Sequence, residues 1–131
     1  MSDKRILGAA MGMATATARK PRAVLVGKTG SASVSDQLRK LDWDVMTVPT
    51  SENLACAVLA RKPSVVVLPL GLDGESGFLV AAKLQATKRK LRVVLVGATR
   101  TPEAERFAKF VGAAFVAETD GVGKLVNAVV A

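Results

Sequence analysis

The residues most suggestive of chemistry are Gly27, Lys28 and Thr29, which follow a short apolar segment. A glycine, a lysine and a threonine in this order end the P-loop, in which backbone N–H groups and the lysine hold phosphate oxygens. That loop needs a further glycine five residues before Gly27, where the chain has Arg22. No Gly-x-Gly-x-x-Gly follows the segment either. We therefore expect neither a nucleoside triphosphate nor a dinucleotide site here.

A lone anion makes smaller demands, and Lys28, Thr29 and Arg100 could contact one together. Thr29 follows the first apolar segment of the chain and Arg100 follows the fourth. In open α/β sheets, ligands bind beyond the carboxyl ends of the strands, where such residues gather. The alternative is that all three are solvated loop residues.

Other chemistry is excluded by residues that the chain lacks. It has no His, no Tyr and a single Cys, Cys56. His-based acid–base catalysis, serine–histidine triads, and His or multi-Cys metal sites all need residues that are absent. No internal disulfide can form, and we expect Cys56 to be a small core residue. The sequence thus predicts no catalytic residue, no metal, no cofactor and no enzymatic activity.

Five short apolar segments alternate with five amphipathic ones along the rest of the chain. The expected strands are residues 23–26, 44–48, 65–68, 92–96 and 114–117. The expected helices have apolar faces at helical spacing: Val34, Leu38, Leu41; Leu54, Ala55, Val58, Leu59; Phe78, Ala81, Ala82, Leu84; Ala104, Phe107, Ala108, Val111; Val122, Leu125, Val126, Val129. Thr101 and Pro102 are a favourable helix start, and Gly112 a favourable helix end.

Three of the expected strands are apolar on both sides, a habit of parallel sheets covered by helices on both faces. Strands and helices that alternate over short connections predict an α/β fold with three layers and a doubly wound, five-stranded parallel sheet.

The chain has 131 residues, which suits one domain. We assign residues 21–131 to that domain. Residues 1–20 differ in composition, with mostly Ala, Gly, Met and Thr, and we expect an N-terminal extension that is flexible or docks a partner. No apolar run approaches the ~20 residues of a membrane-spanning helix.

The third strand–helix unit carries the most distinctive text, Val65-Val66-Val67-Leu68-Pro69-Leu70-Gly71-Leu72-Asp73-Gly74-Glu75-Ser76-Gly77-Phe78, and Gly112-Ala113 precedes the last strand. With these features, the chain from Arg22 to Ala131 resembles the receiver domain of two-component response regulators, nearest in length to the single-domain, CheY-like chemotaxis type. The resemblance implies a flavodoxin-like strand order of 2-1-3-4-5 and a cytoplasmic role in signal transduction.

The chain departs from the receiver pattern at each position that carries the chemistry. Receivers have a phosphoacceptor Asp, two acidic residues that hold Mg²⁺, a hydroxyl residue and a Lys. The corresponding residues in this sequence are Pro69 for the phosphoacceptor, Gly27 and Lys28 for the acidic pair, Gly97 for the hydroxyl residue and Glu118 for the Lys.

These changes remove phosphoryl transfer, which needs a carboxylate nucleophile and a metal ion to neutralise the developing charge. Proline offers no nucleophile, and Lys28 places a positive charge where Mg²⁺ would need carboxylates. Asp73 could replace the missing acceptor, although a surface Asp is the simpler interpretation. The sequence therefore predicts a pseudo-receiver that is not phosphorylated.

Without phosphorylation, the resemblance implies a protein–protein interaction module in bacterial signal transduction, whose partner is another signalling protein or a second copy of the chain. Receivers signal through their fourth helix, fifth strand and fifth helix. Here that face would expose Lys109, Phe110, Glu118 and Lys124. Phe115 matches the aromatic residue that reports activation in receivers, and we expect it to be fixed in the core.

Two other functions stay open. The net charge of +8 and the basic clusters Arg19-Lys20-Arg22 and Lys88-Arg89-Lys90-Arg92 would suit nucleic acid. Aromatic residues make up only 4% of the chain, however, which weakens the case for a base-stacking surface. The other alternative is a domain that senses a small anion or a nucleotide.

Overall fold

The computed structural model describes residues 21–29, 32–49, 54–72, 75–87 and 90–131. Its main feature is a five-stranded parallel sheet with the order β3-β2-β4-β7-β8. The strands are β2 (Arg22–Val26), β3 (Asp44–Val48), β4 (Val65–Pro69), β7 (Arg92–Gly97) and β8 (Ala114–Ala117). Numbered along the chain, this is the predicted order 2-1-3-4-5, and the predicted α/β fold is confirmed.

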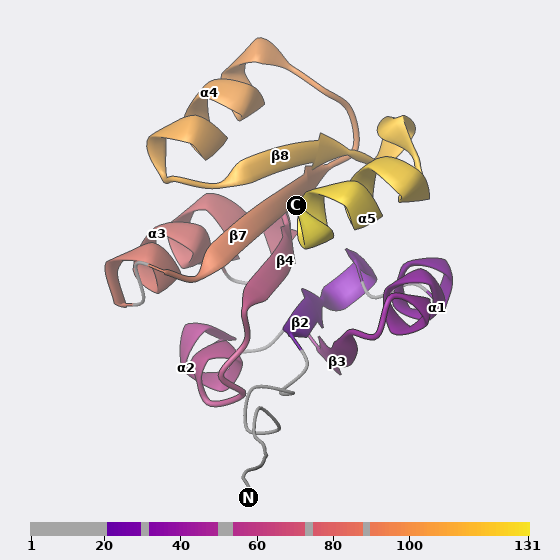
Figure 1. Ribbon diagram of the computed structural model, residues 1–131. Coiled ribbons are helices and arrows are strands. Elements are labelled where there is room, and N and C mark those ends of the chain that lie inside the picture. Colours follow the sequence, from indigo (N-terminus) through magenta and orange to yellow (C-terminus); the bar gives the residue numbers. More distant parts are fainter. Residues whose placement is uncertain (1–20, 30–31, 50–53, 73–74, 88–89) are drawn as a thin grey trace, which may run out of the picture.

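Helices cover both faces of the sheet, so that the molecule has three layers (Figure 1). The helices are α1 (Ala32–Lys40), α2 (Leu54–Leu59), α3 (Gly77–Thr87), α4 (Pro102–Phe110) and α5 (Val122–Val130). α1 and α5 lie on one face, and α2, α3 and α4 lie on the other (Figure 1). Short 3-10 turns, η2 (Gly27–Thr29) and η3 (Glu118–Asp120), follow the first and last strands of the sheet in chain order.

The strands are apolar throughout because each supplies both layers of the core. In β4, Val66 and Leu68 pack toward α2 and α3, whereas Val65 and Val67 pack toward α1 and α5. All four side chains are fully buried. Burial of an aliphatic side chain contributes roughly 1.5–3 kcal/mol, so the central strand is a main source of stability.

The ends of α4 follow the predicted signals. Thr101 Oγ1 accepts a hydrogen bond from the Ala104 N–H at 3.1 Å, and Pro102 is the first helical residue. Gly112 follows the helix with a φ of +77°, the left-handed conformation that glycine adopts without strain.

The core position predicted for Cys56 is wrong, and two residues of the predicted apolar helix faces, Leu41 and Phe107, are also exposed. Cys56 is exposed, because the short helix α2 turns Leu54 and Val58 inward and a residue two positions from each lies on the opposite side. Leu41 follows the end of α1 and is 54% exposed, and Phe107 is 50% exposed because the small Ala108 is the residue of α4 that faces the sheet.

The loop after β4 has structure that the sequence did not predict. β5 (Gly71–Leu72) and β6 (Glu75–Ser76) pair as a small antiparallel sheet just before α3. Across the described ranges, none of the helices has the length and apolar character needed to cross a membrane.

Candidate functional site

A cleft of about 440 Å³ opens at the carboxyl edge of the sheet, on the side of α1 and α5. Its walls come from the ends of β4, β7 and β8 and from the facing sides of the two helices. Most of the lining is apolar, including Val34, Leu70, Val96, Val116, Val122 and Leu125. Open α/β folds bind their ligands at this edge, so the cleft is the candidate site.

The residues Gly27, Lys28 and Thr29 form the turn η2 at one end of the cleft. Gly27 has a φ of +58°, a conformation that suits glycine and turns the chain sharply out of β2. The buried Thr29 Oγ1 lies 2.7 Å from the Val26 carbonyl oxygen and 3.2 Å from that of Val67, and its hydroxyl donates to them. Thr29 therefore joins the carboxyl ends of β2 and β4.

Pro69 ends β4 and lines the cleft. The next residue, Leu70, donates its N–H to the Val96 carbonyl at 2.9 Å, which continues the pairing with β7. Gly77 begins α3 directly against this segment: a Cβ atom there would lie 2.3 Å from the Pro69 carbonyl oxygen. Only glycine permits this close approach, which brings α3 against the end of the central strand.

Gly97 ends β7, and the side chains of Leu70 and Phe115 occupy the space that a side chain at position 97 would need. A Cβ atom on Gly97 would lie 2.9 Å from Leu70 Cδ1 and 3.0 Å from Phe115 Cζ. The Phe115 ring is partly buried and packs against the core layer that faces α2, α3 and α4. The ring and Leu70 thus fill the volume that a larger residue at position 97 would occupy.

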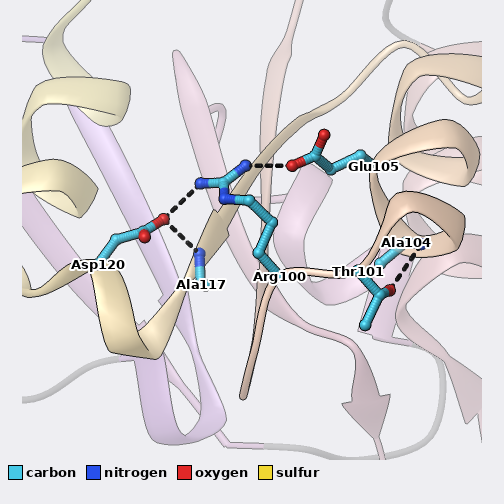
Figure 2. A network of polar contacts seen from close by, with 6 residues as sticks. All are labelled: Arg100, Thr101, Ala104, Glu105, Ala117 and Asp120. Carbon is cyan, nitrogen blue, oxygen red and sulfur yellow. Dashed lines mark hydrogen bonds and ion pairs between the residues drawn. The ribbon is translucent and has the colours of Figure 1, made fainter.

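Arg100 links two segments beside the cleft (Figure 2). Its Nη1 donates to Glu105 Oε1 on α4 at 2.6 Å, and its Nη2 donates to Asp120 Oδ2 in η3. Asp120 Oδ2 also accepts the Ala117 N–H at 3.1 Å. The guanidinium carbon lies 5.6 Å from the centre of the Phe115 ring, within the range of a cation–π contact.

These contacts affect two ionisable groups. The Ala117 N–H, followed by the Arg100 guanidinium, holds the pKa of the Asp120 carboxyl below its ordinary value, because both stabilise the charged form. The hydrogen bonds to Glu105 and Asp120 raise the pKa of Arg100. Arg100 is therefore a charged clamp between the β7–α4 loop and the β8–α5 turn.

The predicted anion contacts do not form one set among the residues described. Thr29 donates to backbone carbonyls, and Arg100 is paired with two carboxylates. Glu118, a carboxylate, lines the cleft. The side chain of Lys28 and the whole of Asp73 lie outside the described part of the structure. The described residues contain no cluster of three or more His, Cys, Asp or Glu able to hold a metal ion.

The four residues of the predicted interaction face, Lys109, Phe110, Glu118 and Lys124, are all exposed. Phe110 is 85% exposed at the end of α4. Phe107, one turn earlier on α4, has its ring centre 5.3 Å from that of Phe78 on α3. Three of the four phenylalanines of the chain therefore belong to α3 and α4.

Arginines at the opposite, amino-terminal edge of the sheet donate to backbone carbonyls. Arg22 Nη1 donates to the Arg61 carbonyl at 2.6 Å, Arg61 Nη1 to that of Ala57 at 2.7 Å, and Arg92 Nη1 to that of Ala128 at 3.2 Å. These donors satisfy carbonyl groups in α2, in α5 and in the segment that precedes β4. Arg19, Lys20, Lys88 and Arg89 of the predicted basic clusters lie outside the described residues.

Comparison with solved structures finds receiver domains. The signal receiver domain of a putative LuxO repressor protein from Vibrio parahaemolyticus is 20% identical with a TM-score of 0.74, covering 86% of this chain and 88% of that one. The receiver domain of the Francisella response regulator 1452 is 12% identical with a TM-score of 0.73, covering 84% and 93%. A CheY-like receiver domain protein from Methanospirillum hungatei is 16% identical with a TM-score of 0.68, covering 83% and 90%.

No family model matches the chain, and no curated protein matches it. At these identities, the structural likeness shows the fold: the chain has the CheY-like receiver fold, in which the cleft lies at the carboxyl ends of the strands.

Proposed function

We propose that this chain is a pseudo-receiver, a receiver-like module that is not phosphorylated and that acts by binding a protein partner. The observation that carries the proposal is the apolar cleft at the carboxyl edge of a receiver fold. Pro69 ends the central strand there, and Gly97, Leu70 and Phe115 close the neighbouring strand end with carbon atoms.

Phosphoryl transfer onto a receiver needs a carboxylate nucleophile and Mg²⁺, which prefers carboxylate and water oxygens. The described residues at the strand ends do not fit that ion. Pro69 and Gly97 offer no side-chain oxygen, and the Thr29 hydroxyl is bonded to backbone carbonyls. Glu118 is the sole carboxylate among the described residues that line the cleft. The described strand ends therefore do not provide the ligands of a magnesium site.

The surroundings of Phe115 support a constant conformation. Gly97 and Leu70 lie against its ring, and the Arg100 guanidinium lies over it while bound to α4 and η3. The elements that would move in a switch are thus joined by charged hydrogen bonds, which are stronger than neutral ones. Such a module would present one docking surface at all times.

The docking surface that we propose consists of Lys109, Phe110, Glu118 and Lys124. Phe110 is largely exposed at the end of α4, beside the exposed and charged Lys109, and this composition suits an interface anchor with a polar rim. By analogy with receivers, the partner is a bacterial signalling protein of the cytoplasm or a second copy of the chain. The receiver fold provides the scaffold, and the partner provides the output.

Two experiments test the proposal. In the first, the full chain is incubated with acetyl phosphate and Mg²⁺ and its intact mass is measured, beside a receiver that has its phosphoacceptor Asp. We expect the mass of this chain to stay unchanged. A gain of one phosphoryl group would overturn the pseudo-receiver proposal.

In the second, the chain is used to capture partners from its native cells. Phe110→Ala is compared with Leu79→Ala, which removes a half-exposed apolar side chain from α3, outside the proposed surface. We expect Phe110→Ala to lose a partner that Leu79→Ala keeps. Equal capture by the two variants would rule out this surface.

A further inference from the structure

We propose that the cleft at the carboxyl edge binds a small, mainly apolar molecule that carries a hydrogen-bond donor, such as a protonated amine, at one end. This site goes beyond the proposed docking of a protein partner, since it involves a different class of ligand, although Glu118 belongs to both.

The size and the lining of the cleft favour such a ligand. A volume of about 440 Å³ falls within the range of roughly 300–1,000 Å³ that is typical of small-molecule sites. Val34 and Leu125 come from the neighbouring helices α1 and α5, and Val96 and Val116 come from the adjacent strands β7 and β8, whose side chains belong to the same core layer. An apolar group bound between these side chains would be stabilised by about 25 cal/mol for each Å² of apolar surface that it buries.

Among the described residues of the lining, the two polar side chains, those of Thr29 and Glu118, specify the rest of the ligand, because both are acceptors. The Thr29 hydroxyl already donates its proton to the Val26 and Val67 carbonyls, so only its lone pairs remain. Glu118 is exposed and lines the cleft, and its carboxylate makes no hydrogen bond or ion pair with any residue that the structure describes. A hydrogen-bond donor of the ligand can therefore bind to the Glu118 carboxylate, whereas an anion would be repelled by it.

The cleft thus favours a neutral or positively charged donor, whereas an anion site would favour a negatively charged ligand. Among the described side chains, Arg100 is the cation beside the cleft, and it is paired with Glu105 and Asp120 and is not part of the lining. The described side chains of the cleft therefore disfavour the phosphate-like ligands that its position in the fold would suggest.

Three probes that share the indole ring system test the inference. Indole is neutral, tryptamine is cationic, and indole-3-acetate is anionic. Each is added to the full chain at millimolar concentration while thermal unfolding is followed. A ligand at ten times its Kd should raise the Tm by about 4 °C. We expect tryptamine to bind about two- to fivefold more tightly than indole, the gain of a partly exposed ion pair. Binding of indole-3-acetate as tight as that of tryptamine, or no shift with any probe, would refute the inference.

Variants locate the binding. Ala98 is exposed and lines the cleft, so Ala98→Trp should fill the cleft and abolish the Tm shift. Thr99→Trp adds the same side chain at the next exposed position, outside the lining, and should keep the shift. Glu118→Gln should remove the advantage of tryptamine and leave indole binding unchanged. If Glu118→Gln kept the full advantage, the proposed donor contact would be wrong, whether or not Ala98→Trp folds.

Discussion

Phe115 and Gly97 lie against each other across the last two strands of the sheet. The Phe115 ring is so close to the Gly97 backbone that a Cβ atom there would come within 3.0 Å of Cζ and 3.1 Å of Cε1. The glycine and the aromatic ring therefore depend on each other: the ring has space because residue 97 has no side chain. A hydroxyl residue at position 97, as receivers have, would need the ring and Leu70 to move.

This relationship predicts that Gly97→Thr destabilises the chain. Overpacking of a buried position typically costs about 1–3 kcal/mol. Urea denaturation of the variant should show a lower midpoint with an unchanged slope. Gly123→Thr is the matched control: nothing lies within 4 Å of its Cβ position on α5, and the variant should be as stable as the parent or slightly more so.

Adding Phe115→Ala to Gly97→Thr tests the mechanism. Removal of the ring opens the space that the new threonine side chain needs, so the two changes should cost less together than the sum of each alone. Strictly additive costs would show that the ring is not what opposes a side chain at position 97.

The Arg100 clamp predicts a pH dependence through Asp120. The pKa of the Asp120 carboxyl is lower in the folded chain than the ordinary value of 3.8, so the folded state binds fewer protons than the unfolded state near this pH. The contribution of Asp120 to stability is therefore complete above the ordinary pKa and is lost as the pH falls through the lowered one.

Asp120→Asn removes the charge that makes this contribution. The parent should be more stable than the variant at pH 7, and the two denaturation midpoints should converge below pH 3.8. A gap between the midpoints that stayed constant from neutral to acid pH would contradict this role of Asp120.

The two exposed phenylalanines of α4 should differ in their effect on stability. Phe107→Ala removes a ring whose centre lies 5.3 Å from that of Phe78, and aromatic pairs contribute about 0.5–1.5 kcal/mol beyond their buried area. Phe110 is 85% exposed, and Phe110→Ala should stay within about 0.5 kcal/mol of the parent. Chemical denaturation of both variants would check this, and a larger loss for Phe110→Ala would mean that its ring packs within the chain.

The contacts of Arg92 predict that arginine and lysine at this position differ in stability although they carry the same charge. Its guanidinium donates to the Ala128 and Val129 carbonyls at the end of α5. A lysine cannot reproduce this fork, so Arg92→Lys should lose roughly 1–2 kcal/mol although the net charge is unchanged. Lys90→Arg, at an exposed neighbour, should have the same stability as the parent. Equal stability of all three chains would show that the contacts with α5 contribute nothing.

Most of the fold could be predicted because its signals are local. Two-sided apolar segments such as Val65-Val66-Val67-Leu68 predict buried parallel strands, and Thr101, Pro102 and Gly112 mark the ends of α4. The core position predicted for Cys56 is wrong because Leu54 and Val58 define the buried face of α2, and a residue two positions from each points to the other side.

The site was harder to predict because its contacts join distant parts of the chain. Arg100 and Asp120 are twenty residues apart, and only the sheet order brings the β7–α4 loop beside η3. The chemical departures at Pro69 and Gly97 could be recognised in the sequence, but the ring that fills the space beside Gly97 could not. Its position depends on the rotamer of Phe115, which no local signal sets.

The sheet separates the two apolar layers, and this limits how distant events can affect one another. The cleft lies on the side of α1 and α5, whereas Phe78 and Phe107 lie on the other side, where α3 and α4 pack. The strands between them contribute buried side chains to both layers. Leu70 lines the cleft and also packs against the opposite layer, and it touches the same position as Phe115. A molecule in the cleft and a protein on α4 are therefore connected around the rim, by way of Leu70 and Phe115 and by way of the Arg100 hydrogen bonds to Glu105 and Asp120.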